Sequence, residues 1–168
     1  RLLKSSGTAH EWQQLISKGK HNLIDFNKVH GRALRNMVKG KYLKNQGLEA
    51  KYNEWITKPE TTNVKYTGFV HELFEPIVKF SSLSRVDANL RETINKQFDT
   101  LVNKSKDNDN LTRFIVVRDT SGSMGSMAAG TKMTCNHLAK SLALYFSEFL
   151  TGTFANSWIE FNSNAKMH

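Results

Sequence analysis

The sequence predicts an α/β protein in which a helical region, residues 1–110, precedes the first part of a Rossmann-like domain with a parallel sheet, residues 111–168. Two observations support this prediction. Before Asn110 the apolar residues recur at the three- and four-residue steps that are typical of helices. After Asn110 an apolar run, an amphipathic helix and a second apolar run follow one another, which is the order of a strand–helix–strand unit in a parallel sheet.

The first half of the helical region is expected to hold three helices. A short apolar pattern predicts a helix over residues 12–16, and another predicts a helix over residues 48–56 that ends before the turn at Lys58 and Pro59. Between them, one apolar stripe predicts a single long helix over residues 25–44.

Two further helices are expected before the junction. The first covers residues 69–78 and has Pro76 near a bend, because proline interrupts helical hydrogen bonding. The second covers residues 84–103, where a single apolar face runs along the whole helix and must pack on something. The wholly polar residues 104–110 are read as the junction between the two regions.

The second region begins with an apolar run over residues 114–117, which predicts a strand buried on both faces of a parallel sheet. A helix follows, for which Thr134 is the expected N-cap. Residues 157–161 predict a second strand. Since the chain begins at Arg1 and ends soon after this strand, we expect it to be a truncated portion of something longer.

Composition narrows the class of protein. Among 168 residues, 24 Lys and Arg face 15 Asp and Glu, and the net charge of +9 favours polyanionic or acidic partners. The single cysteine, Cys135, cannot form an internal disulfide, which favours a reducing compartment. No apolar run approaches the roughly 20 residues of a membrane-spanning helix, and no signal peptide is recognisable. We therefore expect a cytoplasmic protein with no membrane partner.

The basic excess is local. Residues 18–58 hold ten basic residues against three acidic ones, a net charge of +7. Aromatic residues interleave with the basic ones, a composition found on surfaces that contact nucleic acids. An RNA-binding role would use five side chains of this segment: Lys28, Arg32, Arg35, Lys39 and Lys41. The alternative is that these residues form the ordinary solvated face of helices.

The chemistry-bearing motif lies between the first strand and its helix. Asp119 supplies an anionic oxygen there, and Ser121 and Ser123 supply hydroxyl oxygens that a glycine-containing turn can direct to one point. The carboxyl end of a parallel strand is where α/β sheets bind ligands. Hard oxygen donors suit Mg²⁺, Mn²⁺ or Ca²⁺.

This segment, an Asp-x-Ser-Gly-Ser-Met sequence after a strand, resembles the metal-ion-dependent adhesion site (MIDAS) of von Willebrand factor A (vWA) domains. The resemblance implies that Asp119 acts through water, that both serine hydroxyls touch the cation, and that one coordination position stays open for an acidic residue of a partner. The family also takes a threonine and a further aspartate from later loops. This chain stops at His168, and Asn162, Ser163 and Asn164 do not replace those loops by position. Either the missing loops were removed, are disordered or belong to a separate segment, or the site is incomplete and binds metal weakly.

A helical region before such a domain resembles the TROVE-module (Ro-like) proteins, and still more a related uncharacterised group found in cells and large phages. The segments that carry this resemblance are residues 10–12, 65–69 and 158–164. The resemblance implies an RNA-binding role for the helices. A separate hypothesis, which this resemblance does not imply, places the chain among the subunits of a viral assembly.

Three enzymatic interpretations of the same loop agree less well with its sequence. The glycine spacing of residues 125–130 is that of a phosphate-binding loop, but Thr131 and Lys132 follow in the reverse of the required order. Ser123 lacks the glycine two residues earlier that an esterase nucleophile needs. A phosphatase that used Asp119 as its nucleophile would need a second acid where Ser121 stands.

The sequence therefore predicts a non-enzymatic binding protein that recognises an acidic protein partner through a divalent metal site and RNA through its basic helices. One alternative is a structural or packaged component of an assembly such as a virion, in which the vWA motif is architectural. A third hypothesis is that the protein is a nucleotide-dependent enzyme.

Overall fold

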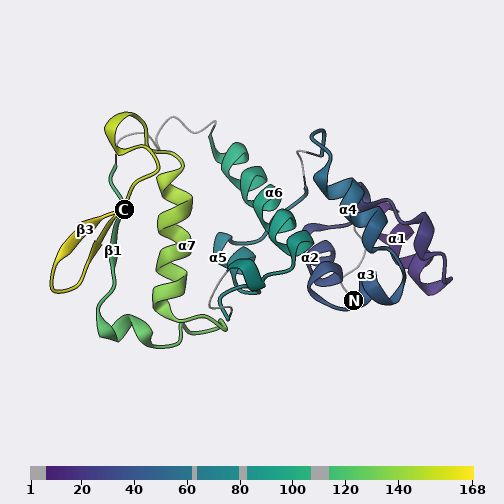
Figure 1. Ribbon diagram of the computed structural model, residues 1–168, viewed down its shortest axis with the longest axis horizontal. Helices are drawn as coiled ribbons and strands as arrows, with labels where there is room; N and C mark the ends of the chain where they lie inside the picture. Colours follow the sequence, from purple (N-terminus) through teal and green to yellow (C-terminus); the bar gives the residue numbers. More distant parts are fainter. Residues whose placement is uncertain (1–6, 62–63, 80–82, 107–113) are drawn as a thin grey trace. The chain divides into compact units, whose positions relative to one another are not determined.

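The computed structural model describes residues 7–61, 64–79, 83–106 and 114–168. Within these residues it contains seven α-helices and one small mixed sheet of three strands, which confirms the α/β class (Figure 1). In this part of the chain no helix is long and apolar enough to cross a lipid bilayer.

The chain divides into two compact units. The helical unit comprises Arg1–Thr67 and Val86–Thr100, and the sheet unit comprises Gly68–Arg85 and Leu101–His168. These units are defined by contacts within the chain, and the predicted boundary at residue 110 between a helical region and a vWA-like domain stays a prediction.

The helical unit consists of short helices joined by tight turns. Its elements are α1 (Gly7–Ser17), the 3₁₀ turns η1 (His21–Leu23) and η2 (Phe26–Lys28), α2 (Gly31–Lys39), α3 (Tyr42–Asn45), α4 (Glu49–Thr57) and the first part of α6 (Ala88–Ser105). Helices α1, α4 and α6 confirm three of the predicted helices.

The predicted single helix over residues 25–44 is wrong, because the backbone leaves the helical conformation twice. Asp25 caps the short turn η2 through its side chain, and Val29 and His30 are then extended. Helix α2 begins at Gly31, where the chain passes so close to another segment that a Cβ would lie 2.0 Å from the carbonyl oxygen of Lys65. An extended Gly40 ends α2.

Buried polar residues connect α6 to the rest of the helical unit. The Tyr52 hydroxyl is hydrogen-bonded to Thr93 Oγ1 at 2.7 Å, and Thr93 Oγ1 itself donates to the carbonyl oxygen of Asn89. Gln97 Nε2 donates to the carbonyl oxygen of Gly31 at 3.0 Å. Thr93 and Gln97 are fully buried. The apolar face predicted for this helix therefore also carries specific polar contacts.

The sheet unit contains α5 (Val70–Phe74), η3 (Leu83–Arg85), the end of α6, β1 (Val117–Asp119), η5 (Gly122–Gly125), α7 (Cys135–Ser147), η6 (Gly152–Phe154), β2 (Ile159–Phe161) and β3 (Ala165–Met167). Helix α5 ends before Pro76, so the helix predicted over residues 69–78 is shorter than expected, since proline cannot donate the helical hydrogen bond. Helix α7 confirms its prediction, including the Thr134 cap, whose side chain accepts from the backbone N–H of His137.

The sheet has the order β1–β2–β3. Strands β1 and β2 are parallel, with Val117 opposite Ile159 and Asp119 opposite Phe161, which confirms the predicted strand–helix–strand unit. Strand β3 was not predicted, and it pairs antiparallel with β2.

The prediction that residues 114–117 form a strand buried on both faces is wrong. Strand β1 begins only at Val117, and the side chains of Ile115 and Val117 are 43% and 55% exposed. Helix α7 packs against β1 (Figure 1). The Arg118 side chain lies on this face of the sheet, because it bonds Asn136 on α7. The opposite face carries Val117 beside the exposed side chains of Phe161 and Met167. One face of the sheet is covered within this chain, and the other is exposed.

Candidate metal-binding loop and ion cluster

The predicted metal ligands begin at the carboxyl end of β1. Asp119 is the last residue of the strand, and Thr120 fixes the chain there through two bonds to the carbonyl oxygen of Phe161, 2.8 Å from its backbone nitrogen and 3.0 Å from its hydroxyl. The loop thus leaves the sheet at the edge where the parallel strands β1 and β2 both end. This is the position at which ligands bind in α/β sheets.

The loop brings the three predicted ligands together. The Asp119 carboxylate accepts a hydrogen bond from the backbone N–H of Ser121 at 2.7 Å. Ser121 then precedes the 3₁₀ turn η5, whose first hydrogen bond runs from the backbone N–H of Met124 to the carbonyl oxygen of Ser121. This turn places the hydroxyl oxygens of Ser121 and Ser123 3.1 Å apart, and the two hydroxyls are hydrogen-bonded to each other.

The separation of the two hydroxyl oxygens suits a hard cation. Adjacent ligands of an octahedral Mg²⁺ with metal–oxygen bonds near 2.1 Å lie about 3.0 Å apart, and the Ser121 and Ser123 oxygens have nearly this spacing. Asp119 and Ser121 are half-buried and Ser123 is exposed, so the site opens to solvent. Among the described residues, no group of three or more His, Cys, Asp or Glu side chains is placed to hold a metal. The donor set at this loop is thus one carboxylate and two neutral hydroxyls.

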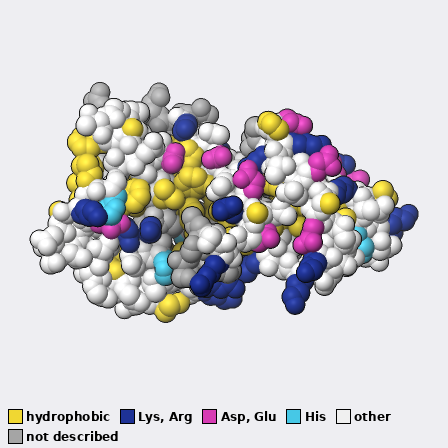
Figure 2. Space-filling view, viewed as in Figure 1, with side chains coloured by type: hydrophobic (Ala, Val, Ile, Leu, Met, Phe, Trp, Pro, Cys, Tyr) yellow, Lys and Arg dark blue, Asp and Glu magenta, His cyan; other side chains and the backbone are white. Residues whose placement is uncertain are grey.

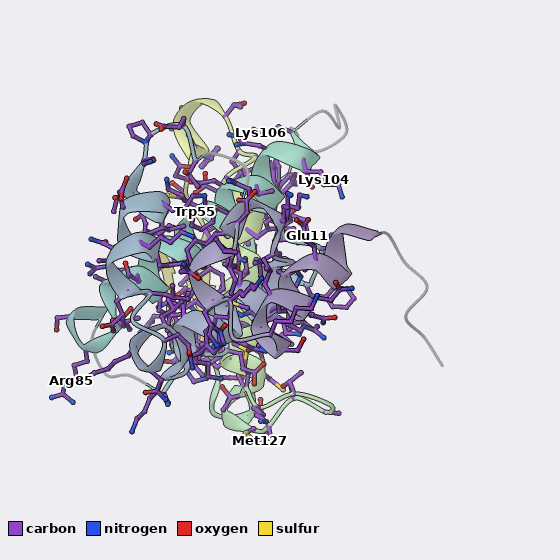
Figure 3. All side chains as sticks on the ribbon, turned by 90° about the vertical axis from the view of Figure 1, so that its right-hand side faces the viewer. Glu11, Trp55, Arg85, Lys104, Lys106 and Met127 are labelled. Carbon is purple, nitrogen blue, oxygen red and sulfur yellow. The ribbon has the colours of Figure 1, made fainter. Side chains whose placement is uncertain are left out.

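A hairpin-like loop connects η5 to α7. Met127 and Thr134 form an antiparallel bridge, and the backbone nitrogen of Cys135 donates to the carbonyl oxygen of Ser126 at 2.8 Å. These bonds hold the start of α7 beside the candidate metal ligands. Met127 is 61% exposed and projects from this loop (Figure 3).

The asparagines after β2 have a structural role. The Asn162 side-chain oxygen accepts from the backbone nitrogen of Asn164 and from the hydroxyl of Ser163, both at 3.2 Å. The three residues form the turn between β2 and β3. Such an Asn-rich turn between two short runs is a hairpin signal, and it could have predicted β3.

A second polar cluster lies on the α7 side of the sheet, and sequence reasoning did not find it. Arg118 is 7% exposed and bonds both the Glu160 carboxylate on β2 and the Asn136 side chain on α7. Trp158 donates to Glu160 at 3.0 Å, and the His168 imidazole lies 3.2 Å from the same carboxylate and stacks on Trp158. No sequence motif links these residues, because the strand register brings them together.

The environment of Glu160 favours its ionised form. The hydrogen bond from Trp158 lowers the pKa of Glu160 most, and the positive charges of Arg118, His168 and Lys140 act in the same direction, while burial opposes them. Glu160 therefore acts as the acceptor that neutralises the buried guanidinium of Arg118.

One of the five basic residues predicted to contact RNA is buried, and the other four are exposed. Arg35 is 5% exposed and lies over the Tyr66 ring, and Lys28 forms an ion pair of 3.1 Å with Glu11. Arg32, Lys39 and Lys41 are exposed. On the face seen in Figure 2, lysine and arginine side chains of the helical unit are intermixed with acidic ones.

The structure therefore arranges the two predicted sets of site residues differently. The loop places the Ser121 and Ser123 hydroxyls next to each other and bonds the Asp119 carboxylate to the backbone of Ser121, whereas one of the five basic residues, Arg35, lies in the core. Comparisons of the chain with family models, with curated proteins and with solved structures find no match.

Proposed function

We propose that this chain is a non-enzymatic binding protein that holds a divalent cation at Asp119, Ser121 and Ser123 and uses it to recognise an acidic side chain of a protein partner. The observation that supports this most is the 3.1 Å spacing of the two serine hydroxyls next to the Asp119 carboxylate. The resemblance of this segment to the vWA metal site agrees with the proposal.

The charge of the donor set explains why the partner would be acidic. One carboxylate and two neutral hydroxyls leave a bound Mg²⁺ or Mn²⁺ with a net positive charge and with several positions filled by water. A carboxylate from outside can replace one of these waters, because hard cations prefer anionic oxygen. The same small number of ligands makes the affinity for the metal alone low.

The proposal is tested by titrating MgCl₂ and MnCl₂ into the full chain while its thermal unfolding is followed. A ligand that binds only the folded state raises the unfolding temperature. We expect this rise in the wild type and in Ser126→Ala, a matched control one turn beyond the motif. We expect none in Asp119→Ala or Ser123→Ala. Equal titration curves for the wild type and Asp119→Ala would contradict the proposal.

RNA binding by the helical unit is a second candidate function, and the observation that favours it is the exposure of Lys39 and Lys41 within the segment of net charge +7. Phosphate contacts release counterions, so affinity falls as salt rises, with a slope of about one unit lost per contact removed. The double variant Lys39→Met, Lys41→Met should reduce this slope by about two. An affinity that does not change with salt would count against RNA binding.

A further inference from the structure

A cavity in the helical unit is lined by none of the residues in the two predicted site sets. Its volume is about 380 Å³, and its walls come from the segment around Ile24 and Phe26 and from the face of α4 that carries Lys51 and Trp55. Ile24 and Phe26 are buried, and Lys58 is exposed. This volume is at the lower end of the range of small-molecule sites and is sufficient for one nucleotide.

Lys51 places a fixed positive charge at the cavity wall. Its ammonium donates to the carbonyl oxygens of Asn22 and Ile24, at 2.7 and 2.9 Å, and lies 5.6 Å from the centre of the Phe26 ring. Among the described residues no carboxylate forms an ion pair with it. An ammonium has three N–H donors, so two carbonyls hold this group in place and leave one donor and the full charge for an anion.

Trp55 provides an aromatic surface beside this charge. Its indole N–H donates to the side-chain oxygen of Asn27 at 3.1 Å, and its ring centre lies 5.5 Å from that of Phe26 and 5.4 Å from that of Tyr52. These contacts hold the indole in one orientation, while Trp55 remains half-buried and lines the cavity. A preoriented aromatic side chain that is partly open to solvent suits stacking with a planar ring.

The other charges of the cavity restrict the ligand. Lys58 is paired with Glu54 at 3.2 Å, and this exposed pair is weak enough for a phosphate to take the place of the carboxylate. Asp25 also lines the cavity, and its Oδ1 accepts from the backbone and side-chain nitrogens of Asn27. The two carboxylates balance the two lysines, so the cavity has no general excess of positive charge. Its selectivity for an anion would therefore come from the position of the Lys51 ammonium.

From this arrangement we propose that the cavity binds a nucleoside monophosphate, with the base against Trp55 and the phosphate between Lys51 and Lys58. The source of this unit is either a free mononucleotide or one residue of a single-stranded RNA. The inference is independent of the metal loop. It rests on the proposed RNA-binding function only if the ligand is a residue of single-stranded RNA.

The test measures binding of adenosine monophosphate and of a fluorescent single-stranded oligoadenylate of eight residues to the full chain. Lys51→Met and Trp55→Leu should each weaken binding of adenosine monophosphate about tenfold, the range expected for one charged contact or one stacked base. Lys44→Met, which removes an exposed lysine that neither lines the cavity nor belongs to the five predicted RNA contacts, should leave it within twofold of wild type. Since Lys51 also holds the backbone of its neighbours, Lys58→Met provides a cavity variant that does not disturb them.

The two ligands separate the possible sources. Binding of both, with losses in the cavity variants, supports a site that serves RNA, and binding of the mononucleotide alone supports a free nucleotide. Absence of saturable mononucleotide binding below about 1 mM, or equal losses for Lys44→Met and the cavity variants, would overturn the proposal. If Asp119→Ala loses stabilisation by Mg²⁺ but still binds the nucleotide, the result supports both proposals and shows that the two sites are independent.

Discussion

The helical unit and the sheet unit differ in how completely they bury their apolar side chains. Ten large hydrophobic side chains of the described residues are exposed, and Leu23 is the only one of these in the helical unit. The other nine belong to the sheet unit, where they include Val117, Phe161 and Met167 on the uncovered face. Short amphipathic helices can bury their apolar faces against each other, whereas a sheet with α7 on one side leaves its other side exposed.

The largest loss of stability is expected at Gly31, where the chain passes close to the backbone of Lys65. In Gly31→Ala the new Cβ would lie 2.0 Å from the Lys65 carbonyl oxygen, and backbone cannot move aside as a side chain can. We expect a loss of more than about 3 kcal/mol in the free energy of unfolding, measured by urea denaturation. Gly122→Ala in the sheet unit has open space around its Cβ and should be nearly neutral. Equal losses for the two variants would contradict this account of the packing.

The difference in burial can be tested with one substitution made in each unit. Val29 is 1% exposed and Val117 is 55% exposed. Val29→Ala should cost about 2–3 kcal/mol in the free energy of unfolding, since it removes buried methyl groups and leaves a cavity. Val117→Ala should cost less than about 1 kcal/mol. A large loss in the second variant, under the same urea denaturation, would mean that this sheet face is covered in solution.

Removing the buried hydrogen bond between Tyr52 and Thr93 should destabilise the helical unit by a smaller amount. Thr93→Val leaves the Tyr52 hydroxyl without its partner in a fully buried position and should cost about 2 kcal/mol, whereas Tyr52→Phe removes that hydroxyl and should cost about 1 kcal/mol. Thermal unfolding of both variants measures the difference. The reverse order would show that Tyr52 finds another partner when Thr93 is absent.

The smallest expected effect is a change in how the stability of the sheet unit depends on pH. The pKa of Glu160 is lowered from its ordinary value of 4.5, so the folded state favours the carboxylate. The resulting stability is present above about pH 4.5 and is lost as the pH falls through the lower folded-state pKa. Glu160→Gln should therefore flatten the acid side of the stability profile, measured by thermal unfolding between about pH 6 and pH 3. Glu54→Gln, which removes the exposed pair with Lys58, should keep the wild-type profile.

The sequence was informative where one local pattern determines the structure. The long apolar stripe of α6 and the Thr134 cap of α7 follow from spacing within a single helix, and the oxygen cluster of Asp119, Ser121 and Ser123 follows from spacing within a single loop. These predictions needed no knowledge of tertiary contacts.

The incorrect predictions concern features that depend on contacts between distant segments of the chain. The break at Gly31 is determined by the approach of Lys65, and the burial of Arg35 is determined by Tyr66, so neither can be read from helical periodicity. The pair of Arg118 and Glu160 depends on the register of β1 and β2. Likewise, an apolar run predicts a strand but does not show how many layers cover it, and for this reason the burial of β1 was wrongly predicted.

The stacking of Trp158 on His168 provides an optical probe of the sheet unit. The chain has three tryptophans, and Trp12 and Trp55 belong to the helical unit. In a Trp12→Phe, Trp55→Phe background, the emission of Trp158 alone would report on the open end of the β2–β3 hairpin, where Trp158 pairs with His168 and its indole also bonds Glu160. Fluorescence could then follow the unfolding of the sheet unit separately, without an attached dye.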